Sequence, residues 1–342
     1  MANFHLLILV YFLQIVFSFL GFLMLLFQII RRPFSFYKTK SRNVPPACLS
    51  DPSHGTHEYI TANGIKFHCV SKGDPSKPLM LFVHGFPEFW FSWQYQLKEF
   101  CNDYRVVAID MRGYGETDKP AGVRNYTIEI LKEDIVQLIK VLSPDRKCIL
   151  VAHDWGGVVS WRVVQNHPEL FHKFIVMNCP HAKVYRRAIT KGWKQTLKSW
   201  YIFFFQCPWI PEMLLAINDY AAFDDMFKKG LFLNKDFSDD MVEAFKYTFS
   251  PRRNLTPPIN YYRCMFMSSN RKHSYSSQKI ETPTLLIWGE RDLALDMSLS
   301  DKKEYNDICT DITIKRIPGC SHFVQQDCPH LTNQHMREFL EQ

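Results

Sequence analysis

Short apolar runs, separated by segments with helical periodicity, recur along most of this 342-residue chain and limit the folds it can adopt. Runs of about four to eight apolar residues bounded by turn residues are typical of buried parallel strands. Strand and helix in alternation predict an α/β fold, with a mostly parallel sheet and helices on both faces. A helix is expected at residues 127–142, and strands within residues 78–86, 105–115, 148–157, 173–181, 282–292 and 312–322.

The alternation stops between about residues 182 and 278, where the sequence carries aromatic segments compatible with helices, such as 193–206 and 239–249. This pattern predicts a helical cap, or lid, inserted into the α/β core. We therefore expect four segments: an anchor and linker at 1–50, a first core part at 51–181, the lid at 182–278 and a second core part at 279–342.

The N-terminus begins with an apolar run of 25 residues, from Leu6 to Ile30. A helix of this length extends about 37 Å at roughly 1.5 Å per residue, which is enough to cross a bilayer. A cleaved signal peptide would need a basic leader, a shorter apolar core and a small-residue cleavage site, and the sequence has none of these. A buried core helix would be expected to show a polar face. The run therefore predicts an uncleaved, single-pass anchor in contact with the lipid bilayer.

The net charge of +7 is concentrated after this run, with no acidic residue before Asp51. The positive-inside tendency then places the body of the protein in the cytoplasm, on the endoplasmic reticulum membrane. The sequons at Asn125 and Asn254 would be used only if the body were lumenal. Five of the seven net charges belong to this basic flank, and the two that remain for the rest of the chain do not support binding to nucleic acid. The five basic residues of the flank are Arg31, Arg32, Lys38, Lys40 and Arg42.

The ten cysteines show no two-residue spacing of the kind found in zinc knuckles or redox motifs. Several lie inside apolar runs, where cysteine behaves as a small buried hydrophobe. We expect neither a metal site, nor a disulfide framework, nor a cofactor.

The segment "VAHDWGG", residues 151–157, has the pattern of a nucleophile elbow. In such a turn a strained bend from strand to helix presents a nucleophile, and small residues are required on both sides of it. Ala152 and Gly156 are the small residues here, and Asp154 stands where a serine is more common. Aspartate is also favoured as the N-cap of a helix, which is the alternative interpretation of this position.

The segment "VHGFP", residues 83–87, ends an expected strand and is the usual position of an oxyanion-hole donor. The backbone N–H groups of Phe86 and Trp155 would then point into one pocket. A plain tight turn is the alternative.

A general base is expected at His322, in "IPGCSHF", because it follows the last expected strand on a loop that can reach the elbow. Asp292, in "WGERD", follows the preceding strand and could orient the imidazole. The order Asp154, Asp292, His322 is the nucleophile–acid–base order of α/β-hydrolases. His84 and His153 are expected to brace the two loops.

Together, "HGFPEFWFSW", "DMRGYGETDKP", "HDWGG", "WGERD" and "GCSHF" resemble the epoxide hydrolases of the α/β-hydrolase fold, over essentially all of residues 50–342. With its apolar N-terminus, the chain most resembles the membrane-anchored branch of epoxide hydrolases 3 and 4. The resemblance implies two lid tyrosines that donate hydrogen bonds to the epoxide oxygen. They correspond to Tyr201 and Tyr262, although Tyr261 is adjacent and lid packing is the alternative role.

The resemblance also implies a mechanism in which a carboxylate is useful. Asp154 would open the strained ring by displacement at carbon, forming an alkyl ester. Water activated by His322, itself held by Asp292, would then attack that ester in the oxyanion hole of Phe86 and Trp155, and a vicinal diol would leave. A carboxylate is ionised near neutral pH without help, whereas a serine hydroxyl would need a base for the displacement.

Two dehalogenase families and one non-catalytic protein class remain as alternatives at this point. Haloalkane and fluoroacetate dehalogenases use the same aspartate, but the former usually carry Asn or Glu at the position of Phe86, and the latter carry arginines around the elbow. Serine esterases are excluded by the residue type at the elbow. A membrane-tethered binding protein without turnover is the third. The expected substrate is a lipophilic epoxide, such as an epoxy fatty acid, and we expect no obligate protein partner.

Overall fold

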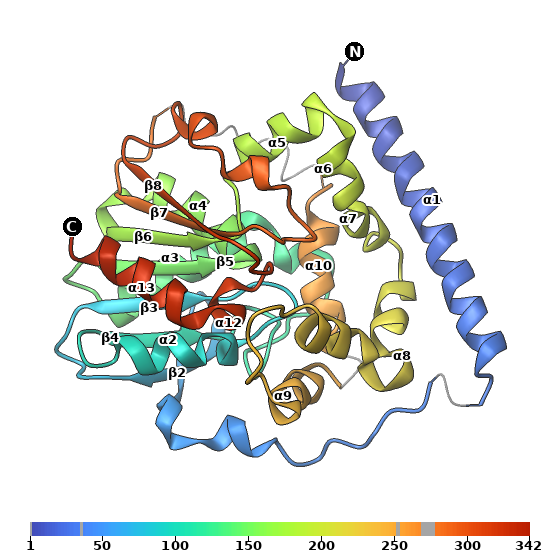
Figure 1. Cartoon of the computed structure of the whole chain (residues 1–342), viewed down its shortest axis with the longest axis horizontal. Helices are drawn as coiled ribbons and strands as arrows, with labels where there is room; N and C mark the ends of the chain where they lie inside the picture. Colours follow the sequence, from blue (N-terminus) through green and yellow to red (C-terminus); the bar gives the residue numbers. More distant parts are fainter. Residues whose placement is uncertain (1, 35–36, 251–253, 268–277) are drawn as a thin grey trace.

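A single eight-stranded sheet forms the centre of the molecule (Figure 1). The computed structural model describes residues 2–34, 37–250, 254–267 and 278–342. The strands are β1 (Thr56–Ala62), β2 (Ile65–Lys72), β3 (Leu79–Val83), β4 (Arg105–Ile109), β5 (Cys148–His153), β6 (Phe171–Met177), β7 (Thr284–Gly289) and β8 (Ile312–Ile317).

The strand order is β1-β2-β4-β3-β5-β6-β7-β8. Strands β3 to β8 are parallel to one another, whereas β2 pairs antiparallel with both β1 and β4. The prediction of a mostly parallel sheet is therefore confirmed, and each of the six expected strands is present. The β1–β2 hairpin was not predicted. Its edge strand β1 is polar and largely exposed, so it lacks the continuous apolar run that marks the buried parallel strands.

Helices cover both faces of the sheet, as the alternation predicted. Helices α3 (Ile128–Leu142) and α4 (Asp154–Asn166) lie on one face (Figure 1). Helices α2 (Gln94–Phe100), α12 (Val324–Asp327) and α13 (Pro329–Leu340) lie on the other. Strands β3 to β7 are almost completely buried, because the sheet is covered on both sides there.

A helical cap follows β6, and its described helices all lie within the segment expected to form the lid. Parts of that segment, residues 251–253 and 268–277, lie outside the described residues. In α8, Asn218, Asp219 and Tyr220 have left-handed backbone conformations, with φ of 51°, 60° and 60°. The cap helices are α5 (Ala182–Lys191), α6 (Trp193–Lys198), α7 (Trp200–Phe204), α8 (Ile210–Asp224), α9 (Asp239–Phe249) and α10 (Thr256–Cys264).

Short helical turns complete the chain. Most are 3₁₀ turns on loops, while η6 is a π-helical turn in the cap. They are η1 (Ala47–Ser50), η2 (Pro52–His54), η3 (Trp90–Trp93), η4 (Val123–Tyr126), η5 (Pro168–Leu170), η6 (Asp225–Lys229), η8 (Met297–Ser300) and η9 (Lys302–Tyr305).

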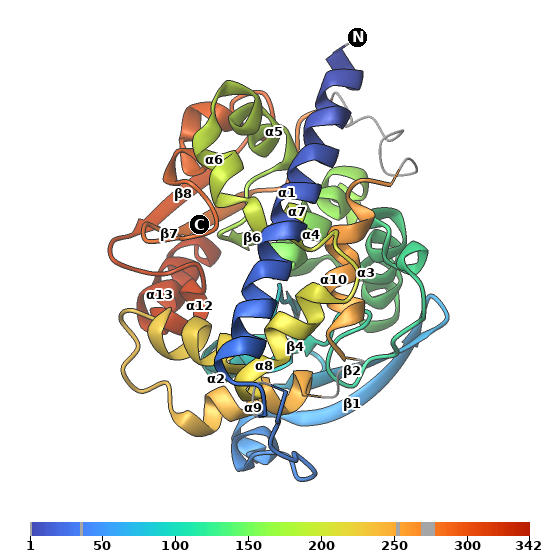
Figure 2. The ribbon, with the colours of Figure 1, turned by 90° about the vertical axis from the view of Figure 1, so that its right-hand side faces the viewer.

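The N-terminal run forms one long helix, α1 (Ala2–Arg31), which lies along the outside of the cap (Figures 1 and 2). Its segment Tyr11–Arg31 is long and apolar enough to cross a membrane by length and composition, and only 11% of its most apolar window is buried in the protein. The expected anchor therefore exists as a helix with a largely exposed apolar surface.

Candidate active site

Asp154 lies at a sharp junction between β5 and α4. Its φ is +45°, a left-handed conformation that costs an ordinary residue roughly 1–2 kcal/mol. A Cβ atom at Gly156 would lie 2.2 Å from the carbonyl oxygen of Val83, and one at Gly85 would lie 2.4 Å from the Cβ of Asp154. Only glycine fits at these two positions, so the turn has the tight packing that the elbow pattern predicts.

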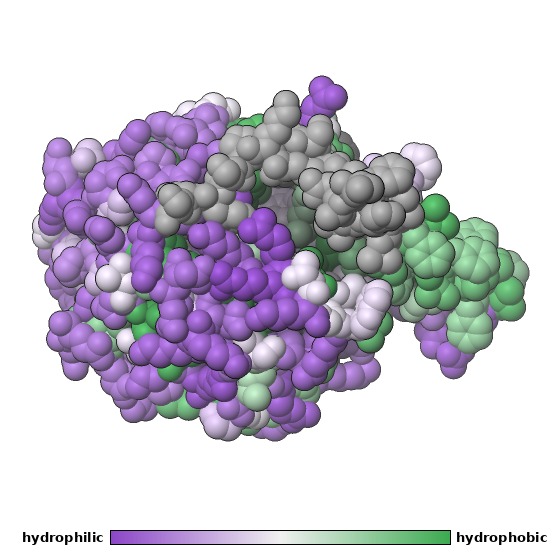
Figure 3. Space-filling model, turned by 90° about the horizontal axis from the view of Figure 1, so that it is seen from above, coloured by the Kyte–Doolittle hydropathy of each residue, from purple (hydrophilic) through white to green (hydrophobic). Residues whose placement is uncertain are grey.

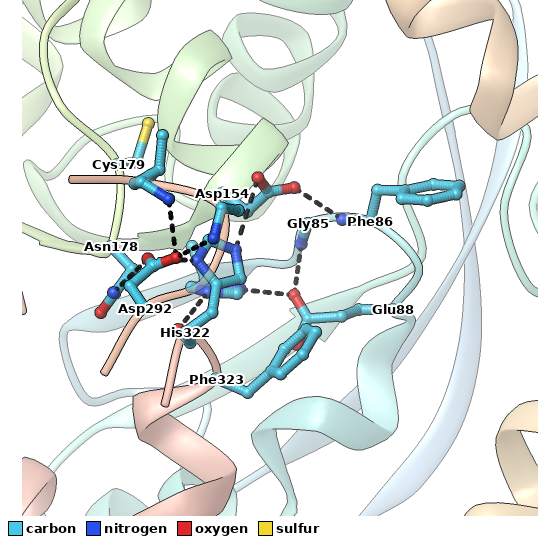
Figure 4. A network of polar contacts seen from close by, with 12 residues as sticks. Gly85, Phe86, Glu88, Asp154, Asn178, Cys179, Asp292, His322 and Phe323 are labelled. Carbon is cyan, nitrogen blue, oxygen red and sulfur yellow. Dashed lines mark hydrogen bonds and ion pairs between the residues drawn. The ribbon is translucent and has the colours of Figure 1, made fainter. Parts of the chain in front are cut away.

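The carboxylate of Asp154 does not cap its own helix. The N-cap residue of α4 is His153, which makes no side-chain cap hydrogen bond. Asp154 Oδ1 instead accepts a hydrogen bond of 2.8 Å from the backbone N–H of Phe86 (Figure 4). The N–H of Trp155 is in the first turn of α4, where it has no acceptor within the helix. Of the two expected oxyanion donors, the Phe86 N–H thus contacts the Asp154 carboxylate, and the Trp155 N–H is the backbone donor next to Asp154 in the chain.

His322 lies between two carboxylates. Its Nδ1 is 2.6 Å from Asp292 Oδ2, and its Nε2 is 3.6 Å from Asp154 Oδ2 (Figure 4). His322 and Asp292 lie on the loops that follow β8 and β7, and Asp154 is the first residue of α4, directly after β5. They meet because the carboxyl ends of parallel strands share one edge of the sheet.

Asp292 is held by several donors besides His322. Its Oδ1 accepts hydrogen bonds from the backbone N–H groups of Ala294 and Leu295, at 2.7 and 2.8 Å. Its Oδ2 also accepts a 2.6 Å bond from Asn178 Nδ2, while Asn178 Oδ1 accepts from Gly289 N–H. Sequence analysis missed Asn178. The available signal was its place directly after β6, a neighbour of the strands that carry Asp154 and Asp292.

Next to His322 lies a fully buried pair, Glu88 and His153. His153 Nδ1 is 2.5 Å from Glu88 Oε2, and its Nε2 is 3.0 Å from the backbone carbonyl oxygen of His322. Gln325 and Gln326 each donate to Glu88 Oε1, at 2.8 and 3.0 Å. This network ties the loop of His322 to the loop before η3, so His153 braces the site as expected. Glu88 was not foreseen.

The pKa values of the three central groups follow from this geometry. Burial opposes charging of His322, but Asp292 and Asp154 outweigh it and raise the pKa of the imidazole well above its usual value. Burial likewise opposes ionisation of both carboxyls. Their contacts with His322, together with the Phe86 N–H for Asp154 and Asn178 for Asp292, nevertheless lower both pKa values. The resting site is therefore an imidazolium between two carboxylates.

A cavity of about 770 Å³ lies between these groups and the cap. Asp154 and His322 are on its floor, and Tyr201 of α7 and Tyr262 of α10 are on its cap side. The two tyrosine rings are 5.9 Å apart and nearly perpendicular. Tyr261 does not line the cavity, because its hydroxyl donates a 2.7 Å hydrogen bond to the backbone carbonyl of Arg112. Of the two adjacent tyrosines, Tyr262 therefore faces the nucleophile.

Over the part of the chain that the structure describes, no three His, Cys, Asp or Glu side chains are grouped so that they could hold a metal ion. The site therefore consists of two carboxylates and an imidazole, with two phenols across the cavity from Asp154.

Comparison with known proteins agrees with this geometry. Residues 78–328 match the family described as alpha/beta hydrolase fold. The chain is 41% identical to epoxide hydrolase 4 of Homo sapiens, over 94% of this chain and 88% of that protein. It is 45% identical to epoxide hydrolase 1 of Caenorhabditis elegans, over 82% and 69% of the two chains. This chain belongs to the epoxide hydrolases of the α/β-hydrolase fold.

Solved structures of epoxide hydrolases give the same result. The crystal structure of a Bacillus megaterium epoxide hydrolase in complex with an inhibitor superposes with a TM-score of 0.74, at 31% identity, over 83% of this chain and all of that one. An epoxide hydrolase of Vigna radiata gives a TM-score of 0.69, at 28% identity, over 84% and 97% of the two chains. The family that the sequence motifs indicated is thus confirmed.

Replacing Asp292 with Asn should make stability depend differently on pH. The pKa of His322 in the folded protein lies above its unfolded value of about 6.5, so the stability it contributes is full below that pH and decreases as the pH rises through the folded pKa. The pKa of Asp292 is lowered in the folded protein, so its carboxylate contributes its full stability only above its unfolded pKa, at about pH 4. The difference in free energy of unfolding between wild type and Asp292→Asn should therefore be largest between roughly pH 4 and 6.5.

Denaturant unfolding of the detergent-solubilised chain at several pH values measures this difference. Asp296→Asn is the control, since contacts with Lys194 and Ser298 overcome its burial and lower the pKa of Asp296 to about 2 without involving His322. The difference in free energy of unfolding between wild type and Asp296→Asn should be constant from pH 5 to 9. A constant difference for Asp292→Asn over that range would contradict the assignment.

Proposed function

We propose that this protein hydrolyses a lipophilic epoxide to a vicinal diol through a covalent ester on Asp154. The observation that carries the proposal is the carboxylate at the elbow, which faces two tyrosines across an apolar cavity. Serine at this position would suit acyl transfer to a carbonyl substrate. An ionised carboxylate suits displacement at a saturated carbon. The names of the matched relatives point to the same reaction.

In the first half-reaction, Asp154 attacks a ring carbon, the ring C–O bond breaks and an ester C–O bond forms. The hydroxyls of Tyr201 and Tyr262 donate hydrogen bonds to the oxygen that leaves the ring, and one of them supplies its proton. Burial raises the pKa of each phenol well above the usual value. Both are therefore protonated, and thus able to donate, at neutral pH.

In the second half-reaction, His322 acts as the base. Formation of the ester removes the charge of Asp154, and this charge is one of the two that raise the pKa of the imidazole. His322 can then release its proton, which restores the tyrosine that lost one in the first half-reaction, and accept a proton from the water that attacks the carbonyl carbon of the ester. The N–H groups of Phe86 and Trp155 stabilise the tetrahedral intermediate. As the intermediate collapses, the bond between the carbonyl carbon and the original carboxyl oxygen breaks, and that oxygen leaves in the diol with a proton from His322. The oxygen of water remains in Asp154, whose acid proton returns to His322.

The lining of the cavity supports a lipophilic substrate, because most of its walls are aromatic or aliphatic. An epoxy fatty acid is the substrate that we propose. Dehalogenation is disfavoured by the two phenols, since a halide leaving group does not require proton donors of this kind, and by Phe86, whose side chain adds no polar group to the cavity.

A single turnover in ¹⁸O-labelled water, with enzyme in excess over a lipid epoxide, tests the ester mechanism. The first diol should be unlabelled, and the label should appear in the peptide that contains Asp154. His322→Gln should accumulate the ester stoichiometrically with little diol, because the second half-reaction has lost its base. Mass spectrometry of the intact chain and of its peptides measures both.

Asp154→Asn is the matched variant for that experiment, since it retains the shape of the side chain but not its charge. It should form neither ester nor diol. Label that enters the first diol directly would mean that water attacks the epoxide, and would overturn the role of Asp154.

Three Tyr→Phe variants test the role of the phenols. Tyr201→Phe and Tyr262→Phe should each slow ester formation by about 10²-fold, the usual effect of removing one donor to a developing oxyanion. Tyr261→Phe removes an adjacent hydroxyl that binds the Arg112 carbonyl, and should leave the rate within about threefold of wild type. Rapid-quench measurement of the Asp154 ester separates this step from hydrolysis. Equal effects of the three variants would show that the phenols act only through packing.

We also propose that α1 anchors the protein in the endoplasmic reticulum membrane with the catalytic body in the cytoplasm. This rests on the apolar segment Tyr11–Arg31 and on the basic residues that follow it. In microsomes, the chain should resist carbonate extraction, its body should be degraded by added protease, and Asn125 and Asn254 should carry no glycan. A mass decrease on glycosidase treatment would show that the body lies in the lumen, the opposite of the proposed orientation.

A further inference from the structure

Helix α1 is part of the cavity as well as a candidate anchor. Phe17, Leu20, Gly21 and Met24 line the cavity, together with the catalytic groups. Their spacing of three, one and three residues places them on one face of the helix. Leu20 and Met24 are also 46% and 57% exposed, so they lie at the opening of the cavity rather than at its floor.

The contact between α1 and the cap is close and apolar. The Phe17 ring stacks on Phe203 at 6.3 Å and lies 6.2 Å from Trp200. At Gly21 the helix approaches most closely, since a Cβ atom there would lie 2.3 Å from Cε2 of Phe204. The single glycine of the apolar run therefore stands where the helix backbone meets the cap.

Polar contacts fix the other end of α1. Asn218 accepts a hydrogen bond from Arg32 and donates one to Gln28, at 3.3 and 3.5 Å. Beyond the helix, the Arg42 side chain, only 2% exposed, donates to both carboxylate oxygens of Asp219, at 2.7 and 2.9 Å, and to Glu243 at 2.8 Å. Asn218 and Asp219 belong to the left-handed turn of α8. The linker thus holds the helix against the cap at a specific place.

The opposite face of α1 and the adjoining cap surface are apolar and exposed. Seen from above, the described part of α1 forms a green projection beside a mostly hydrophilic body (Figure 3). A continuous apolar surface of this size is rarely left in water, and the length and composition of Tyr11–Arg31 indicate lipid as its partner. The exposed side chains include Phe12, Ile15, Phe19, Phe27 and Ile30 of α1, and Trp193, Leu197 and Trp209 of the cap.

We propose that α1 is a specificity-determining wall of the substrate site, that it enters the membrane together with the adjoining apolar cap surface, and that the cavity opens between α1 and the cap onto membrane lipid. A long-chain epoxide would then enter from the bilayer, with its apolar chain along Phe17, Leu20, Gly21 and Met24 and its epoxide at Asp154. This inference rests on the proposed function for the reaction, but the position of the helix can be tested without turnover.

Two substitutions of the same kind on α1 test the wall. Leu20→Trp adds bulk at the cavity opening, whereas Leu26→Trp adds it on the side opposite Phe17, where 40% of the leucine is exposed and the cavity is not lined. In the full-length chain in membranes, Leu20→Trp should lower the ratio of kcat/KM for a long-chain fatty-acid epoxide to kcat/KM for styrene oxide by about tenfold or more. Leu26→Trp should leave this ratio unchanged. Equal effects of the two variants on the ratio would overturn the proposal.

A photo-crosslinking amino acid at the same two positions provides a readout independent of activity. At position 20 it should crosslink to peptides of the cap, and at position 26 to lipid. Crosslinks to lipid alone from position 20 would show that the helix does not form the wall. If the wild-type chain hydrolysed neither epoxide, the proposed function would fail, while cap crosslinks from position 20 would still establish the contact.

Discussion

The close approach of α4 to the end of β3 is the constraint on which the site depends. Gly156 lies against the carbonyl of Val83, and this contact forces the chain to turn at Asp154 with a positive φ. The turn projects the carboxylate out of the sheet edge toward the Phe86 N–H and His322. Any side chain at Gly156 would push the helix away from the strand, and nucleophile, oxyanion donors and base would separate together. The strain of the turn is offset by the buried sheet on either side of it.

The electrostatics of the site depend in turn on that geometry. One imidazole shared between two buried carboxylates is stable as a charged triad, and in that state Asp154 is an ionised nucleophile. In the proposed mechanism, esterification neutralises Asp154 and leaves the imidazole with Asp292 alone. The same histidine therefore supports the carboxylate in one step and becomes a base in the next, because the reaction itself changes the charge beside it. The Asn178 and backbone donors to Asp292 keep that second carboxylate ionised throughout.

The positions of most site residues were predictable from the sequence, for a physical reason. Asp154, Asp292, His322 and Phe86 lie at or shortly after the carboxyl ends of parallel strands, and these ends come together whatever the details of packing. Glu88 and Asn178 were missed because their roles depend on which side chains meet them in the folded core. The position of Asn178 directly after β6 was a signal for a place near the site, but it does not identify a partner. The choice between Tyr261 and Tyr262 also required coordinates, since adjacent residues on a helix differ by about 100° in direction and either could have faced the cavity.

The role of α1 was hidden from sequence for a related reason. An apolar helix without a polar face looks like a membrane anchor on every side, and nothing in its composition marks the face that contacts the cap. That contact suits the chemistry that we propose. Ring opening needs an apolar, water-poor chamber, yet the ester needs one water molecule for hydrolysis. A cavity walled by an apolar helix and the cap would keep the lipophilic chain of the proposed substrate out of water, while Asp154 and His322 at its floor remain the groups that can use a water molecule.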